Sequence, residues 1–139
     1  MDSLRQLTPD IPIISEENKQ VDYSIRKNWE WFWLIDPLDG TKEFLKGNGQ
    51  FTVNVALIHK NRPVLGVVGV PTRDTIYYAD VETNKAWRLR LNLNLEQSSL
   101  EQIKICPMDP MDLDLCILQS NSHSNDATQG VIARIVKSV

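Results

Sequence analysis

The sequence predicts a mixed α/β fold with a largely antiparallel sheet, and three observations lead to this prediction. The continuous apolar run over residues 31–35 ends abruptly at Asp36 and is typical of a strand that is buried on both faces. Residues 51–88 alternate apolar stretches with short turn signals, which predicts an antiparallel meander. After residue 124 the apolar residues follow helical spacing, which predicts a helix near the C-terminus.

Composition narrows the class of protein. The 139 residues, 42% hydrophobic and 24% charged, are ordinary for a globular domain with its own core. The net charge of −3 disfavours binding to a nucleic-acid polymer, but a small anionic substrate is compatible with an acidic site if cations lie between the two. We expect neither a signal peptide nor a membrane-spanning segment, and we interpret Cys106 and Cys116 as buried thiols of a cytoplasmic protein.

The first third of the chain predicts short elements around one central strand. Residues 4–7 resemble the end of a helix, and residues 12–14 a short strand that enters the acidic pair Glu16-Glu17. Residues 18–30 are polar and predict an exposed connection. Pro37 cannot continue a central strand, so we expect the chain to turn directly after Asp36. A short helix is then predicted from Gly40 to Lys46.

The remaining elements follow from turn residues and apolar spacing. Predicted strands cover residues 51–58, 64–70, 75–79, 86–88 and 113–118. Residues 91–101 are polar and rich in asparagine, which predicts a surface loop. The C-terminal helix would be capped by Ser124, Asn125 or Asp126. Because the chain begins in a helix tail and finishes at a helix end, we expect it to be a fragment of a larger protein.

The chemically informative segment lies at the end of the apolar strand. Asp36 and Asp39 are so close in sequence that they would repel each other unless a cation lay between them. Mg²⁺ suits such a site because it prefers hard oxygen ligands, and the Leu38 carbonyl is a further candidate ligand. Gly40 and Thr41 then open a helix whose free N–H groups can face a phosphate. The alternative, a capping aspartate beside a turn aspartate, is less favoured because an apolar strand precedes the segment and a helix follows it.

The segment Asp36-Pro37-Leu38-Asp39-Gly40-Thr41 resembles the metal-binding signature of the inositol monophosphatase superfamily. The flanking residues, Trp33-Leu34-Ile35 and Lys42-Glu43-Phe44, look like the 3'(2'),5'-bisphosphate nucleotidase branch, whereas inositol monophosphatases usually continue with Thr-Asn-Phe. The stretch Pro12-Ile13-Ile14-Ser15-Glu16-Glu17 is similar to the upstream acidic motif of that branch, and residues 51–58 and 63–68 also resemble it. The resemblance runs from about Leu4 to His123.

This resemblance implies a fold and a set of residue roles. The fold would be the N-terminal half of a sugar-phosphatase-type layered α/β sandwich, with residues 1–139 forming one partial domain that carries the metal-binding half. Glu16, Asp36 and Asp39 would bind Mg²⁺ together with the Leu38 carbonyl. Gly40 and Thr41 would contact the scissile phosphate, and the Thr41 hydroxyl would help to activate the attacking water. Glu16, Leu38 and Asp39 would border the bound substrate as well.

Ser120, Ser122 and His123 form a segment that resembles one near the nucleotide in this branch. Their hydroxyl and imidazole groups can bond phosphate or ribose oxygens. A polar turn between a strand and a helix explains the same residues equally well, so both interpretations stay open.

The resemblance implies an Mg²⁺-dependent phosphomonoesterase that removes the 3'-phosphate of adenosine 3',5'-bisphosphate, or of its sulfated form, in sulfur assimilation. The alternatives are an inositol monophosphatase-like sugar phosphatase and a truncated fragment without catalytic activity.

Relatives carry a further metal-binding Asp in a downstream Trp-Asp pair and an upstream acid that pairs with the Thr41 equivalent. Neither is found in this sequence, so we expect the isolated chain to hydrolyse poorly. A cytoplasmic location, peripheral contact with the inner membrane and a homodimer are compatible with the resemblance.

Overall fold

The computed structural model describes residues 2–19, 21–105 and 125–138. Contacts divide the chain into a first unit, Met1–Lys104, and a second unit, Ile105–Val139, and each is described by itself. The first unit contains the elements α1 (Asp2–Leu7), β1 (Ile13–Ser15), α2 (Tyr23–Arg26), β2 (Trp31–Asp39), α3 (Thr41–Leu45), β3 (Thr52–His59), β4 (Arg62–Val70), the 3-10 helix η1 (Pro71–Arg73), β5 (Thr75–Asp80), β6 (Lys85–Leu91) and β7 (Gln97–Ile103). The second contains α4 (Asp126–Ser138).

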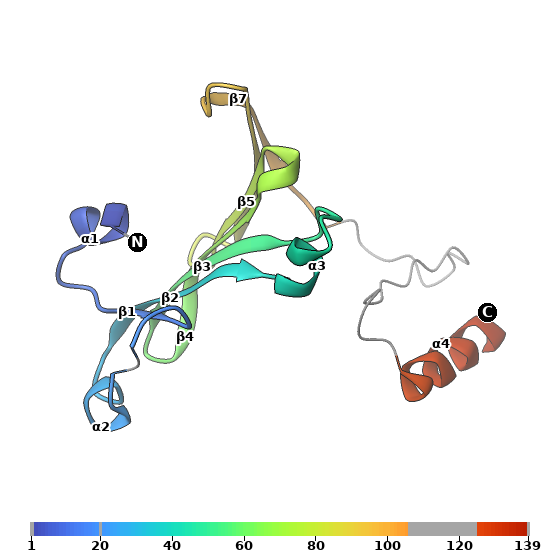
Figure 1. Cartoon of the computed structure of the whole chain (residues 1–139), viewed down its shortest axis with the longest axis horizontal. Helices are drawn as coiled ribbons and strands as arrows, with labels where there is room; N and C mark the ends of the chain where they lie inside the picture. Colours follow the sequence, from blue (N-terminus) through green and yellow to red (C-terminus); the bar gives the residue numbers. More distant parts are fainter. Residues whose placement is uncertain (1, 20, 106–124, 139) are drawn as a thin grey trace. The chain divides into compact units, whose positions relative to one another are not determined.

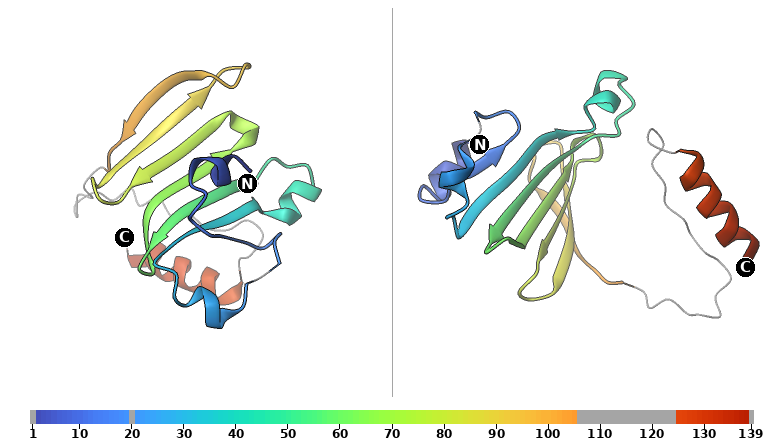
Figure 2. Two further views of the ribbon diagram at one scale, coloured as in Figure 1. Left: turned by 90° about the vertical axis from the view of Figure 1, so that its left-hand side faces the viewer. Right: turned by 90° about the horizontal axis from the view of Figure 1, so that it is seen from below.

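The first unit is built on one seven-stranded sheet in which the strands follow their chain order from β1 to β7. Only β1 and β2 run parallel, and every later neighbour is antiparallel. The sheet is twisted, as its strands fan out in Figure 2. The predicted α/β class, the largely antiparallel sheet and the meander are therefore confirmed.

Register divides the side chains of the sheet between two faces, because directly paired residues point to the same side. One face carries Trp33 and Ile35, which are 8% and 6% exposed. The other face carries Leu34, which is 47% exposed, so the prediction that this strand is buried on both faces is wrong. Leu34 pairs with Ala56, and Ala56 pairs with Gly66, so its neighbours on the β3 side of this row are too small to shield it.

Two stacked aromatic pairs and one side-chain hydrogen bond link neighbouring elements of the sheet. The indole Nε1 of Trp33 donates a 2.9 Å hydrogen bond to the Thr8 hydroxyl, which ties the end of α1 to the sheet. Trp31 stacks on His59 with 3.9 Å between ring centroids, and Trp87 stacks on Tyr78 at 5.1 Å. These tryptophans therefore take part in packing, as tryptophans in strands usually do.

Two predicted connections contain regular structure instead. Residues 91–101, predicted as a loop, include most of β7, which pairs with β6 and is exposed along its whole length. Because an exposed edge strand needs no apolar face, its polar sequence resembles a loop. Residues 18–30 are mostly exposed as expected, but they include α2, whose first turn is capped by the Asp22 side chain.

The second unit confirms the predicted C-terminal helix as α4. The Asn125 side chain accepts a 2.9 Å hydrogen bond from the Thr128 N–H and so caps its first turn. Among the described helices, none combines the length and apolar character needed to cross a membrane. The predicted strand at 113–118 and both cysteines lie outside the described residues.

Candidate active site

The acidic segment is shaped by a β-bulge near the end of β2. Asp36 pairs with Asn54 and Asp39 pairs with Thr52, so three steps along β2 lie against two steps along β3. The predicted turn directly after Asp36 is therefore wrong, since the strand continues through Pro37 to Asp39. Pro37 is tolerated because the bulge removes it from the regular hydrogen-bond ladder.

The bulge also decides which way the two aspartates point. In a regular strand, residues three apart lie on opposite faces of the sheet. Here Asp36 and Asp39 pair with Asn54 and Thr52, which are two apart on β3 and therefore share a face. The extra residue at the bulge thus brings both carboxylates to one side of the sheet.

Glu16 reaches the same side from the neighbouring strand. Ser15, the last residue of β1, pairs with Ile35 and is only 2% exposed, so the next side chain points to the opposite face, where Asp36 lies. The pKa of Glu16 is raised, chiefly by the negative charge of Asp36 and next by a hydrogen bond between the two side chains. Burial and the charges of Glu17 and Asp39 add smaller contributions. The Glu16 and Asp36 side chains therefore lie within hydrogen-bonding distance of each other.

Short-range hydrogen bonds hold the segment in place. The Leu38 N–H donates to Asp36 Oδ1 at 3.1 Å, and the Thr41 hydroxyl donates to the Leu38 carbonyl at 3.3 Å. The Asn54 side chain donates from Nδ2 to Asp39 Oδ2 at 3.0 Å. In these three bonds each aspartate accepts from one neutral donor, and no cationic side chain takes part.

Gly40 joins β2 to α3, which spans Thr41–Leu45 and confirms the short helix predicted from Gly40 to Lys46. Figure 1 shows this short helix at the end of β2. Gly40 has φ +92°, and a Cβ there would lie 2.8 Å from the Gln50 carbonyl oxygen. The position therefore requires glycine, because its φ is left-handed and the Gln50 backbone leaves no room for a side chain.

The side chains at this strand end offer the oxygen ligands that a divalent cation prefers, although only two of the three carboxylates are in contact with each other. Within the described ranges, no group of three or more acidic, histidine or cysteine side chains is arranged to hold a metal ion. Glu16 and Asp36 are in contact, while Asp39 is bonded to Asn54 on the same face. Mg²⁺ is usually held by one or two carboxylates, with waters and substrate phosphates completing its shell. The Glu16–Asp36 pair meets that requirement with oxygen ligands alone.

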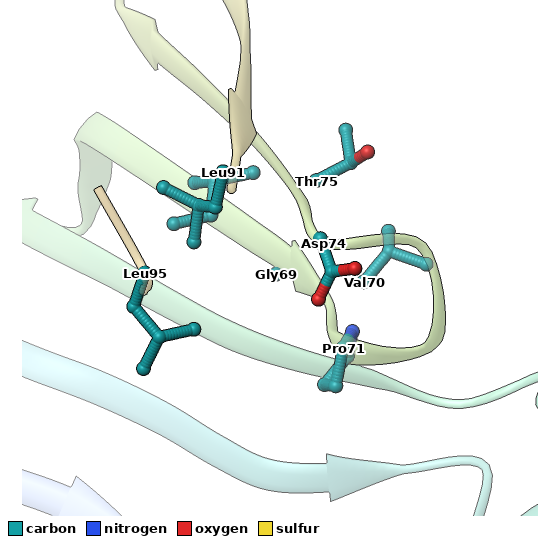
Figure 3. Close-up of a pocket in the computed structure, with 8 residues that line it drawn as sticks. Gly69, Val70, Pro71, Asp74, Thr75, Leu91 and Leu95 are labelled. Atoms are coloured by element: carbon teal, nitrogen blue, oxygen red, sulfur yellow. The ribbon is translucent and has the colours of Figure 1, made fainter. Parts of the chain in front are cut away.

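Two hollows over the described part of the sheet differ in their relation to the acidic residues. A cavity of about 260 Å³ includes Asp36, Asn54 and the exposed Leu34 in its lining. A second cavity of about 250 Å³ is bordered by Leu91 and Leu95 on one side and by Pro71 and Asp74 on the other, as Figure 3 shows. The second hollow has an almost wholly apolar lining and contains none of the predicted site residues. Ser120, Ser122 and His123 lie outside the described residues, so their predicted role is untested.

The seven-stranded sheet and its acidic strand end define a mixed α/β domain with oxygen donors concentrated at the end of β2. The chain belongs to the inositol monophosphatase family, because the model of that family matches residues 1–139. The predicted resemblance is thereby confirmed at the level of the family.

Relatives narrow the similarity further. The chain is 43% identical over 126 residues to the 3'(2'),5'-bisphosphate nucleotidase CysQ of Salmonella typhimurium, covering 91% of this chain and 46% of that protein. It is 51% identical over 132 residues to the CysQ of Buchnera aphidicola, covering 95% of this chain and 45% of the relative. The crystal structure of CysQ from Bacteroides thetaiotaomicron matches with a TM-score of 0.72 and 31% identity, over 99% of this chain and 53% of the other. The chain thus spans about half the length of the relatives it matches.

Proposed function

We propose that this chain is the metal-binding half of an Mg²⁺-dependent phosphomonoesterase. Its substrate would be a small phosphorylated nucleotide, adenosine 3',5'-bisphosphate or its sulfated form, from which the 3'-phosphate is removed in sulfur assimilation. The observation that carries the proposal is the meeting of Glu16 and Asp36 at the end of a strand whose bulge turns Asp39 to the same face. The similarity to nucleotidases named CysQ supports the substrate class.

Each residue of the segment has a proposed role. Glu16, Asp36 and Asp39 hold Mg²⁺ with the Leu38 carbonyl, whose second lone pair is available beside the bond from Thr41. Gly40 and Thr41 contact the phosphate through their backbone. Ser120, Ser122 and His123 contact the nucleotide.

The reaction would be an in-line attack of water on the phosphorus of the 3'-phosphate. The bond between phosphorus and the ribose 3'-oxygen breaks, and that oxygen leaves as the hydroxyl after taking up a proton from solvent. Bound Mg²⁺ would neutralise phosphate charge and make the attacking water more acidic. The Thr41 hydroxyl would orient that water by hydrogen bonding, and the carboxylates of Asp39 and Glu16 would serve as acceptors. Gly40 permits the left-handed turn that leads from Asp39 into the first residue of α3. We also propose that the protein is cytoplasmic, that it forms a homodimer and that it contacts the inner membrane peripherally.

The test uses one sample of the 139-residue chain for two measurements, Mg²⁺ binding and phosphate release from adenosine 3',5'-bisphosphate. We expect Mg²⁺ binding that Asp36→Asn weakens by at least about tenfold, since a ligand is lost and Glu16 no longer has an anionic partner for the cation. Release of phosphate is expected to be slow. Asp74→Asn, which removes a carboxylate from the separate apolar cavity, serves as the matched control and should bind like the parent chain.

Three results would separate the alternatives. No Mg²⁺ binding by the parent chain, or equal binding by Asp36→Asn, would refute the proposed metal site. Faster release from inositol phosphates than from the nucleotide would favour the sugar-phosphatase alternative. Binding of Mg²⁺ without any turnover would leave the non-catalytic fragment as the correct description of this chain.

A further inference from the structure

Asn54 has the contacts of a residue that serves the acidic segment, although its strand contributes none of the proposed ligands. It pairs across the sheet with Asp36, and its Nδ2 donates to Asp39 Oδ2 at 3.0 Å. Directly paired residues on one face have Cβ atoms about 4.5–5.5 Å apart. The amide of Asn54 therefore lies beside both aspartates.

The orientation of this amide is imposed by Asp39. The oxygen of Asn54, Oδ1, is shielded from solvent and has no hydrogen-bond partner among the residues that the structure describes. Turning the amide over would place this oxygen against the carboxylate oxygen of Asp39, and two acceptors repel each other. The side chain thus keeps the donor toward Asp39 even though its own acceptor stays unbonded.

We propose that Asn54 is a positioning residue that fixes the Asp39 carboxylate on the face shared with Asp36. This inference rests on the proposed function. Asp39 is exposed and follows a bulge, so without the bond its carboxylate is free to rotate into solvent. The bond uses one lone pair of Oδ2 and leaves Oδ1 open for a cation. A neutral amide also orients the carboxylate while leaving its negative charge available to a cation. A lysine or arginine at this position would neutralise that charge.

The experiment compares Mg²⁺ binding by the 139-residue chain and by two variants, Asn54→Leu and Asn54→Ser. Leucine keeps the branched shape of asparagine, at a larger volume, but has no donor, and the serine hydroxyl is too short to reach Asp39. The control is Val68→Leu, because Val68 pairs with Asn54 across the sheet, lines the same hollow and makes no bond to Asp39. Two readouts are used: the Mg²⁺ dissociation constant from backbone amide shifts near Gly40, and the rise in Tm that Mg²⁺ causes.

We expect both Asn54 variants to bind Mg²⁺ about tenfold more weakly, as found for partners that orient metal ligands, and to lose much of the Mg²⁺-induced rise in Tm. Val68→Leu should keep both. A merely structural role would lower Tm by the same amount with and without Mg²⁺ and leave the dissociation constant unchanged, and that result would overturn the inference. If one variant fails to fold, the other decides. Failure of the parent chain to bind Mg²⁺ would instead refute the proposed function, and this inference with it.

Discussion

Gly40 is the residue where backbone geometry and the site depend on each other most directly. Its φ of +92° is unfavourable for any side chain, and a Cβ would lie 2.8 Å from the Gln50 carbonyl oxygen. We expect Gly40→Ala to lower the free energy of unfolding by about 2–3 kcal/mol, because backbone strain and a clash with rigid backbone add together. Urea denaturation of the purified variant measures this loss.

Gly47 provides the matched control for this substitution. It also has a positive φ, +65°, but nothing lies within 4 Å of the position that a Cβ would take. Gly47→Ala should therefore cost only the strain, about 1 kcal/mol. If both variants lost the same free energy of unfolding, the close approach of Gln50 to Gly40 would not affect stability, contrary to our description of the turn.

At the scale of elements, the turn between β5 and β6 depends on Asp80. Its Oδ1 accepts hydrogen bonds from the N–H groups of Glu82 at 2.9 Å and Thr83 at 3.3 Å. The bonds to Thr83 are the main cause of the lowered pKa of Asp80. A lowered pKa means that Asp80 stabilises the folded chain above its unfolded pKa, and that this contribution is lost as the pH falls through the folded value.

Asp80→Ala should consequently lower the urea midpoint at neutral pH, and the gap from the parent chain should narrow in acid as the Asp80 carboxylate becomes protonated. Glu82→Gln is the control, because Glu82 contributes its backbone N–H to the turn and its side chain is exposed. A gap that stays constant with pH would show that the charge of Asp80 does not matter to the turn.

Elements with a strong local signal could be predicted from the sequence. The short helix α3 and the meander follow from glycine, proline and apolar alternation. The edge strand β7 was not predicted because its partner β6, rather than its own composition, stabilises it. The bulge at Pro37 was missed for a related reason. A proline after an apolar run indicates an irregularity, but only the register with β3 shows that the strand continues.

The same limit applies to the site. Glu16, Asp36 and Asp39 could be named from their motifs, and Glu16 lies in contact with Asp36, but their role as metal ligands stays a prediction. Asn54 could not be found in this way, since its contact with Asp39 is set by strand register between segments fifteen residues apart. Apolar spacing indicates that residues 51–58 form a strand, but it does not determine which residue stands opposite Asp36.

At the scale of the whole molecule, the described sheet has one well-buried row and one exposed row. Ile35 is 6% exposed and Leu34, its neighbour in β2, is 47% exposed. The two side chains have similar volume and hydrophobicity, so their environments alone should decide what truncation costs. We expect Ile35→Ala to lower the free energy of unfolding by about 2–4 kcal/mol, through lost burial and the cavity left behind.

Leu34→Ala should cost less than about 1 kcal/mol, because nearly half of the side chain already faces water. Urea denaturation of both variants in one buffer gives the comparison, with circular dichroism to verify that each still contains the sheet. Equal losses would mean that the Leu34 face is covered in solution. Asp36 and Asn54 lie on the same face and line the same hollow as Leu34. Anything that shields Leu34 from water would therefore also lie against the acidic segment. Unequal losses would place the acidic segment on the open side of the sheet, where a nucleotide can approach it.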